Sequence, residues 1–142
     1  MRKLLALALA VVSAVTVMVF NCGNAAALSG GEWLGCRIAP GYEFNFYQTC
    51  SNTMGPDEYG NFGVAFRVQN ETAPSTYTWT IPAPYQSSIS TGCTATSNWC
   101  TIQASASRQT IDVSVTLTQG SASETFQASA YITPEYCDPY CL

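Results

Sequence analysis

The sequence predicts an all-β domain, built as a single antiparallel sandwich of two sheets. Large apolar residues alternate with polar ones over runs of strand length. Glycine, proline, asparagine and serine separate these runs at intervals of about ten residues. Six cysteines follow residue 27, an even number that predicts three disulfides formed in an oxidising compartment. A small closed barrel is the alternative, because the same periodicity permits it.

Five segments show the period-two pattern of a strand with one buried face. Their inward-facing sets are Tyr42, Phe44 and Phe46; Val64, Phe66 and Val68; Tyr77, Trp79 and Ile81; Ile111, Val113, Val115 and Leu117; and Phe126, Ala128, Ala130 and Ile132. Turn-forming residues 119–123 join the last two segments, which predicts a β-hairpin. The longest polar insertion, residues 57–62, is expected to be a loop.

The first 27 residues have the pattern of a secretory signal peptide. A charged start (MRK) precedes the apolar residues 4–20, and small residues follow near Ala27. We therefore expect a secreted protein whose single domain spans residues 28–142, with no membrane insertion after cleavage. We expect a disulfide to tether its tail, residues 134–142.

The charge of residues 28–142 is strongly unbalanced. Arg37, Arg67 and Arg108 stand against nine carboxylates, so the net charge is −6, three positive against nine negative charges. Such a surface repels phosphate backbones, so nucleic acid is a poor partner. The same residues include no lysine and no histidine, and serine or cysteine nucleophiles therefore lack their usual bases. We expect no enzymatic activity, no cofactor and no metal.

Cys93 and Cys100 are expected to pair, because only a short turn separates them between strand signals. The pairing of Cys36, Cys50, Cys137 and Cys141 is left open by the sequence. Bridges between the first two and the last two of these would contribute most to stability, about 4.5 kcal/mol against about 2.5 kcal/mol for the short loop.

Two stretches carry a resemblance to a known family. Residues 77–82 (YTWTIP) and 111–132 (IDVSVTLTQGSASETFQASAYI) resemble immunoglobulin-like modules of bacterial secreted proteins, including the polycystic-kidney-disease-type group. In those modules a strand with a Tyr-x-Trp pair precedes a hairpin of Val-x-Val strands. The chain is also similar to small secreted actinobacterial proteins of unknown function. The resemblance implies an immunoglobulin-like β-sandwich outside the cell, and it implies no activity.

Trp99 and Tyr85 are the candidate binding residues. Each lies in a turn or next to a cysteine, outside the inward-facing set of any predicted strand. Exposed aromatic side chains on a rigid sandwich can stack on sugar rings or anchor a protein interface. The alternative is that both residues pack over the disulfides and the ends of the sandwich. The expected function is non-enzymatic binding of an extracellular protein or glycan, at or outside the cell surface.

Two other functions are alternatives. A disulfide-braced secreted proteinase inhibitor would present residues 94–99, or the proline-stiffened residues 82–85, as a rigid loop. A carboxylate-based glycosidase would need two facing carboxyl groups, for which Asp57 with Glu58 and Glu32 with Glu43 are the available pairs. Asp57 and Glu58 lie in GPDEYG, which predicts an exposed turn.

Overall fold

A computed structural model of the chain describes residues 28–41, 44–72 and 74–133. The predicted signal peptide and the tail with Cys137 and Cys141 lie outside these residues. The described elements are β1 (Trp33–Ala39), β2 (Thr49–Ser51), β3 (Asn61–Gln69), β4 (Thr76–Thr80), α1 (Ala83–Gln86), β5 (Ile89–Gly92), β6 (Trp99–Ser105), β7 (Gln109–Gln119) and β8 (Ala122–Ile132). The predicted all-β class is therefore confirmed.

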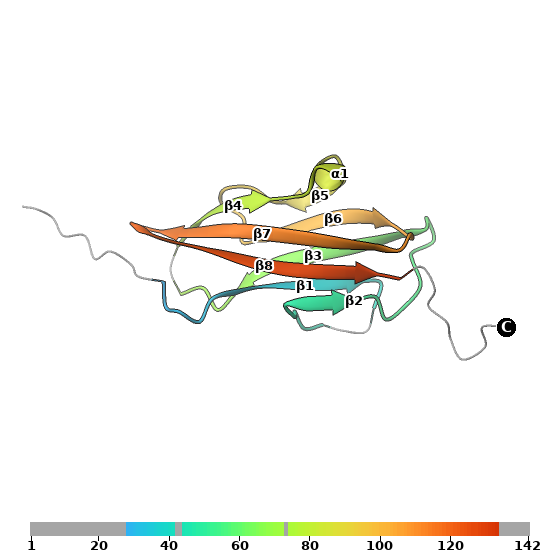
Figure 1. Cartoon of the computed structure of the whole chain (residues 1–142), viewed down its shortest axis with the longest axis horizontal. Coiled ribbons are helices and arrows are strands. Elements are labelled where there is room, and N and C mark those ends of the chain that lie inside the picture. The colour runs from blue at the N-terminus through green and yellow to red at the C-terminus, as the bar shows by residue number, and fades with distance from the viewer. Residues whose placement is uncertain (1–27, 42–43, 73, 134–142) are drawn as a thin grey trace, which may run out of the picture.

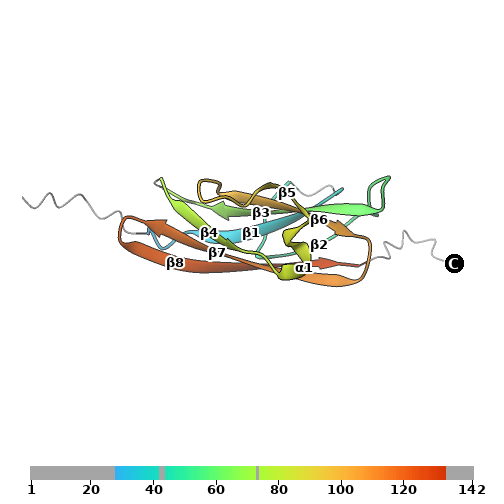
Figure 2. The same cartoon turned by 90° about the horizontal axis from the view of Figure 1, so that it is seen from above.

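The strands form two four-stranded sheets that face each other. The first sheet has the order β1-β3-β6-β5 and the second has the order β2-β8-β7-β4. Figure 1 shows the long β7 and β8 strands, and Figure 2 shows the two layers from above. The prediction of a purely antiparallel sandwich was wrong in one place, because β2 runs parallel to β8. β2 has only three residues, too few to carry a periodicity signal.

The core lies between the sheets and consists of the inward-facing residues of both. The alternating sets predicted for β3 and β7 are buried, as are the last three members of the set on β8. Phe126 is only partly buried and packs against the edge of this core. Period-two patterning thus identified the buried faces of β3, β7 and most of β8 correctly.

The predicted hairpin is formed by β7 and β8, which pair along their full lengths from Gln109↔Ile132 to Gln119↔Ala122. Gly120 and Ser121 make the connection, and Gly120 has a φ of 58°. A two-residue turn of the II′ type needs a positive φ at its first position, which glycine adopts without steric cost.

Residues 44–48 cross from the first sheet to the second at one edge of the sandwich. Tyr47 forms a pair of backbone hydrogen bonds with Cys36 of β1, at 2.7 and 3.1 Å. One residue later, the carbonyl of Gln48 accepts a hydrogen bond from Ser129 N on β8. A disulfide between Cys36 and Cys50 closes this crossing and joins β1 covalently to β2.

The sequence left the pairing of Cys36 and Cys50 open, and the structure joins these two residues to each other. The two cysteines approach because the chain turns directly from the edge of one sheet to the edge of the other, with a Cα–Cα distance of 5.8 Å. The second described disulfide joins Cys93 to Cys100, the pair expected from their spacing.

Three local predictions differ from the structure. No strand includes Phe44 or Phe46, whose segment makes a single β-bridge. β1 begins at Trp33, where no strand was predicted. The predicted loop 57–62 ends early, because β3 begins at Asn61. Phe44 and Phe46 alternate with polar residues for a different reason. Both lie over the outer face of the first sheet.

Candidate binding groove

The outer face of the first sheet is hollowed into a groove with a volume of about 590 Å³. This lies within the range of roughly 300–1,000 Å³ typical of ligand sites. Gly63 and Ala65 of β3 form its floor, with Thr101 of β6 beside Ala65. Because these side chains are small, the central strand of the face is left uncovered between two raised sides.

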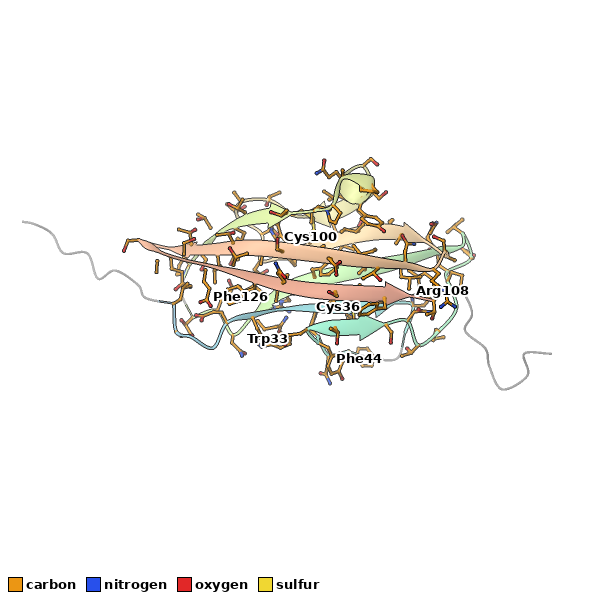
Figure 3. The ribbon with its side chains drawn as sticks, viewed as in Figure 1. Trp33, Cys36, Phe44, Cys100, Arg108 and Phe126 are labelled. Carbon is orange, nitrogen blue, oxygen red and sulfur yellow. A yellow bond between two sulfur atoms is a disulfide. The ribbon has the colours of Figure 1, made fainter. Side chains whose placement is uncertain are left out.

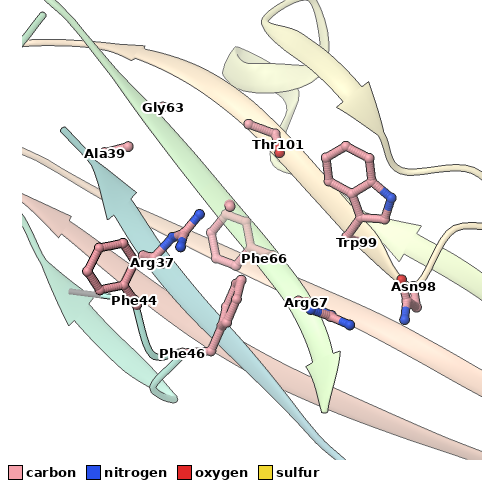
Figure 4. A pocket seen from close by; sticks show the side chains of 11 residues that line it. Arg37, Ala39, Phe44, Phe46, Gly63, Phe66, Arg67, Asn98, Trp99 and Thr101 are labelled. Atoms are coloured by element: carbon pink, nitrogen blue, oxygen red, sulfur yellow. The ribbon is translucent and has the colours of Figure 1, made fainter. Parts of the chain in front are cut away.

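Six residues form the sides of this cavity, which we call the aromatic groove. They are Arg37, Phe44, Phe46, Arg67, Asn98 and Trp99. Figure 4 shows Phe44, Phe46 and Arg37 on the side of β1, and Trp99 and Asn98 across β3 from them. Three aromatic side chains therefore surround a flat floor.

The wall on the β1 side depends on a glycine. A β-carbon at Gly35 would lie 2.7 Å from Phe46 Cβ and 2.7 Å from Trp33 Cζ3. The absence of a side chain at this position allows both aromatic residues to lie against the backbone of β1. Phe44, by contrast, is 84% exposed and stands at the mouth of the groove.

Two of the three arginines after residue 27 lie in the groove. Arg37 pairs across the strands with Ala65, and Arg67 pairs with Gly35 on one side and Trp99 on the other. The two arginines thus occupy diagonal positions, which lie roughly 7–8 Å apart on adjacent antiparallel strands. The guanidinium carbon of Arg37 lies 5.4 Å from the centroid of the Phe46 ring, a cation–π contact.

Neither groove arginine forms a salt bridge with a carboxylate among the residues that the structure describes. Within the same residues, the groove has no acidic lining. The described lining of the groove therefore carries two positive charges and no negative one, on a chain whose formal net charge is −4.

Trp99 has a fixed backbone and a 42% exposed side chain. Its carbonyl accepts hydrogen bonds from Cys93 N and Ser97 Oγ, both at 2.9 Å. The next residue, Cys100, is fully buried and carries the disulfide. An aromatic side chain on so constrained a backbone loses little conformational entropy when a ligand binds.

The loop closed by the Cys93–Cys100 disulfide is held against both sheets. The carbonyl of Ala95 accepts a hydrogen bond from Tyr77 N, and that of Asn98 accepts one from Val68 N. The indole N–H of Trp79 donates to the carbonyl of Ser97 at 3.0 Å. Three carbonyls of the loop are thus used inside the protein, whereas an inhibitory loop presents its backbone to a proteinase. The contacts favour the groove over this loop as the binding surface.

Glu71 fixes the position of Asn98 at the end of the groove. The side-chain amide of Asn98 donates to Glu71 Oε1, and the hydroxyl of Tyr77 donates to Glu71 Oε2. Burial, together with the hydrogen bond to Glu71 and its negative charge, raises the pKa of Tyr77 to about 12. The segment after β3 is thereby attached to β4 and to the disulfide loop.

Tyr77 should make the protein unusually sensitive to alkali. Its pKa is raised from 10.0 to about 12 on folding, so the resulting stabilisation is complete below pH 10. Above pH 10 the unfolded state releases the phenolic proton first, and stability should fall until the pH passes about 12. Thermal unfolding of the wild type and of Tyr77→Phe across this range tests the prediction. An equally steep loss of stability in the variant would contradict it.

Tyr85 does not lie with Trp99. It belongs to the single-turn helix α1, is partly buried against the core, and donates from its hydroxyl to Gln109 Oε1 at 2.9 Å. Of the two predicted binding residues, Trp99 lines the groove, whereas Tyr85 lies outside it and packs against the core.

Two of the carboxylates considered for glycosidase chemistry, Asp57 and Glu32, close turns. Asp57 Oδ1 accepts hydrogen bonds from Tyr59 N and Asn61 N at 3.0 and 2.8 Å. Glu32 accepts from the hydroxyl and the backbone N–H of Ser29, and these bonds hold the pKa of Glu32 at about 2. A carboxyl group with so low a pKa stays ionised and cannot serve as a general acid at neutral pH. Glu43 lies outside the described residues.

The outer face of the second sheet is different in character. Thr116 and Thr125 share a hydrogen bond at 2.8 Å across β7 and β8, and the hydroxyl of Ser129 donates to Asp112 at 2.6 Å. The polar side chains of these cross-strand pairs therefore find hydrogen-bond partners in one another. Among the described residues, this face offers mainly hydroxyl groups, with the exposed Tyr131 on β8 as an aromatic side chain.

Comparison with family models, curated proteins and solved structures gives no match to this chain. Within the described ranges, no helix is long and apolar enough to cross a membrane. In that same part of the chain, no group of three or more histidine, cysteine, aspartate or glutamate residues could hold a metal ion.

Sequence reasoning found Trp99 but missed the other groove residues. Arg37, Phe46 and Arg67 are far apart in the chain, and the register of β1, β3 and β6 brings them together. One signal was available: Arg67 alternates with Phe66 and Val68, which places it on an outer face. The sequence pattern does not indicate which strands lie beside the strand that carries Arg67.

Proposed function

We propose that the chain is an exported, non-enzymatic binding module that takes an extracellular ligand in the aromatic groove. The observation that carries this proposal is the groove itself, where Trp99, Phe44 and Phe46 surround a floor of glycine and alanine. Aromatic side chains at a pocket supply contact area at low entropic cost and are typical anchors of binding sites. Two disulfides among the described residues fit an extracellular protein.

We propose further that the sandwich is of the immunoglobulin-like type. In that fold, strands A, B, E and D form one sheet and C, F and G the other. The orders β1-β3-β6-β5 and β8-β7-β4 match these two sets in chain order. Trp79 lies on β4, the strand equivalent to C, where immunoglobulin domains place a core tryptophan. The disulfide between sheets differs, because it joins β1 to β2.

Replacing Trp99 with alanine tests the proposed site. The oxidised chain would be screened against an array of glycans and extracellular proteins, and any ligand found should bind Trp99→Ala at least about tenfold more weakly. Stability should fall by less than about 1 kcal/mol, because the side chain is 42% exposed.

Tyr59→Ala is the matched control, because Tyr59 is 78% exposed and lies outside the groove. Its binding should equal that of the wild type. The proposal fails if Trp99→Ala binds the ligand as well as the wild type does. A loss of many degrees in melting temperature would instead identify Trp99 as a core residue.

A further inference from the structure

We propose that the ligand of the aromatic groove is an acidic glycan, whose carboxylates are bound by Arg37 and Arg67. This inference rests on the proposed function and adds the chemical class of the ligand. Two of the three arginines after residue 27 line one groove, while no carboxylate does so among the residues that the structure describes. On a chain with nine carboxylates, such a separation of charge favours a negative ligand.

The guanidinium groups are suited to carboxylates. Arginine presents a planar fork of donors that matches a carboxylate in a bidentate arrangement. Arg37 is held over the Phe46 ring, and Arg67 lies directly across the strands from Trp99. The Arg37 guanidinium therefore lies beside an aromatic ring, and Arg67 and Trp99 line the same groove on neighbouring strands.

The floor and walls favour a sugar over an added peptide strand. Gly63 and Ala65 leave a flat surface that can admit a ring, and Trp99 and Phe44 stand at its sides. A peptide that adds a strand to a sheet pairs with the backbone groups of a free edge. The groove instead lies over β3, whose backbone is paired on both sides with β1 and β6. Recognition must then come from side chains, by stacking and by charge.

The test uses the oxidised full chain and a defined set of probes. Oligogalacturonates, hyaluronan oligosaccharides and sialyl-lactose would be compared with methyl-esterified oligogalacturonates, chitin oligosaccharides and lactose, by calorimetry and tryptophan fluorescence. At least one acidic probe should bind about tenfold or more tightly than its neutral counterpart. Its affinity should fall as salt is raised, because screening shortens the range of charge interactions from about 10 Å at 0.1 M to about 3 Å at 1 M.

Three arginine variants separate local from global charge. Arg37→Ala and Arg67→Ala should each weaken binding of the acidic probe by about tenfold. Arg108→Ala removes the same charge from the exposed turn between β6 and β7 and should change affinity by less than about twofold. Figure 3 labels Arg108 in this turn, and it does not line the groove.

Each contrary outcome has a distinct meaning. If neutral and acidic probes bind equally and only Trp99→Ala abolishes binding, the groove is a binding site but its ligand is not acidic. If no acidic glycan binds, or if polyglutamate binds and the glycans do not, the acidic glycan is ruled out as the occupant. If binding to an acidic glycan is unchanged in Trp99→Ala, the proposed site itself is wrong.

Discussion

Replacing Cys36 and Cys50 together with alanine is expected to lower the free energy of unfolding by about 3 kcal/mol. The disulfide closes a loop with a sequence separation of 14, and breaking it frees that loop in the unfolded chain. It also links the edges of the two sheets, where β2 contributes only three residues. Denaturant unfolding of the double variant, in which neither partner remains as a free thiol, measures the loss.

The same variant should also bind the groove ligand more weakly. Phe44 and Phe46 lie between the two bridged cysteines, and their segment makes one backbone bridge to β1, at Tyr47. Without the disulfide, one wall of the groove is less firmly held. For stability alone, Cys93 and Cys100 replaced together provide the comparison, since they close a loop with a separation of only 7. A loss below about 1 kcal/mol for the Cys36 and Cys50 variant, with unchanged binding, would contradict the prediction.

Replacing Gly92 with alanine should be at least as damaging, with a loss of about 3 kcal/mol or more. Gly92 has a φ of 76°, and a β-carbon there would lie 2.2 Å from the carbonyl oxygen of Trp99. The contact is with backbone, so a rotamer change cannot relieve it. The shift would also disturb the hydrogen bond from Cys93 N to Trp99 O, at 2.9 Å.

Thermal unfolding and non-reducing peptide mapping together test the Gly92 prediction. Gly92→Ala should melt earlier and form less of the Cys93–Cys100 disulfide. Gly55→Ala is the control, because nothing lies within 4 Å of an added β-carbon and no positive φ is required there. If both variants unfold at the same temperature, the close approach at Gly92 does not contribute to the free energy of unfolding, and the prediction is wrong.

The fold was predictable where apolar residues alternate and their partners are close in sequence. β7 and β8 meet through a two-residue turn, so their register follows from local pattern alone. β2 was not predictable, because its parallel pairing with β8 joins residues about eighty positions apart and it has only three residues. A single sequence indicates which faces of strands are apolar, but it does not indicate which strands become neighbours.

The candidate site was predictable only in part, for the same reason. Trp99 was predicted as a binding residue because it lies next to Cys100. Phe44 and Phe46 were assigned inward because they alternate, yet the structure places them on the groove. Alternation shows that two side chains share a face, and it does not show whether that face is the core. Glu32 and Asp57 were considered as catalytic carboxylates, but their short-range hydrogen bonds assign them to turns.

The groove is built partly from paired strands and partly from segments that connect strands. Its floor belongs to β3, at the centre of the first sheet, whereas Phe44, Phe46 and Asn98 lie in segments that connect strands. Connecting segments accept sequence change more readily than paired strands do. Randomising Phe44 and Phe46 together with Trp99, while Asn98 keeps its hydrogen bond to Glu71, should therefore yield variants of unchanged framework and altered groove surface, a library from which new binding reagents could be selected.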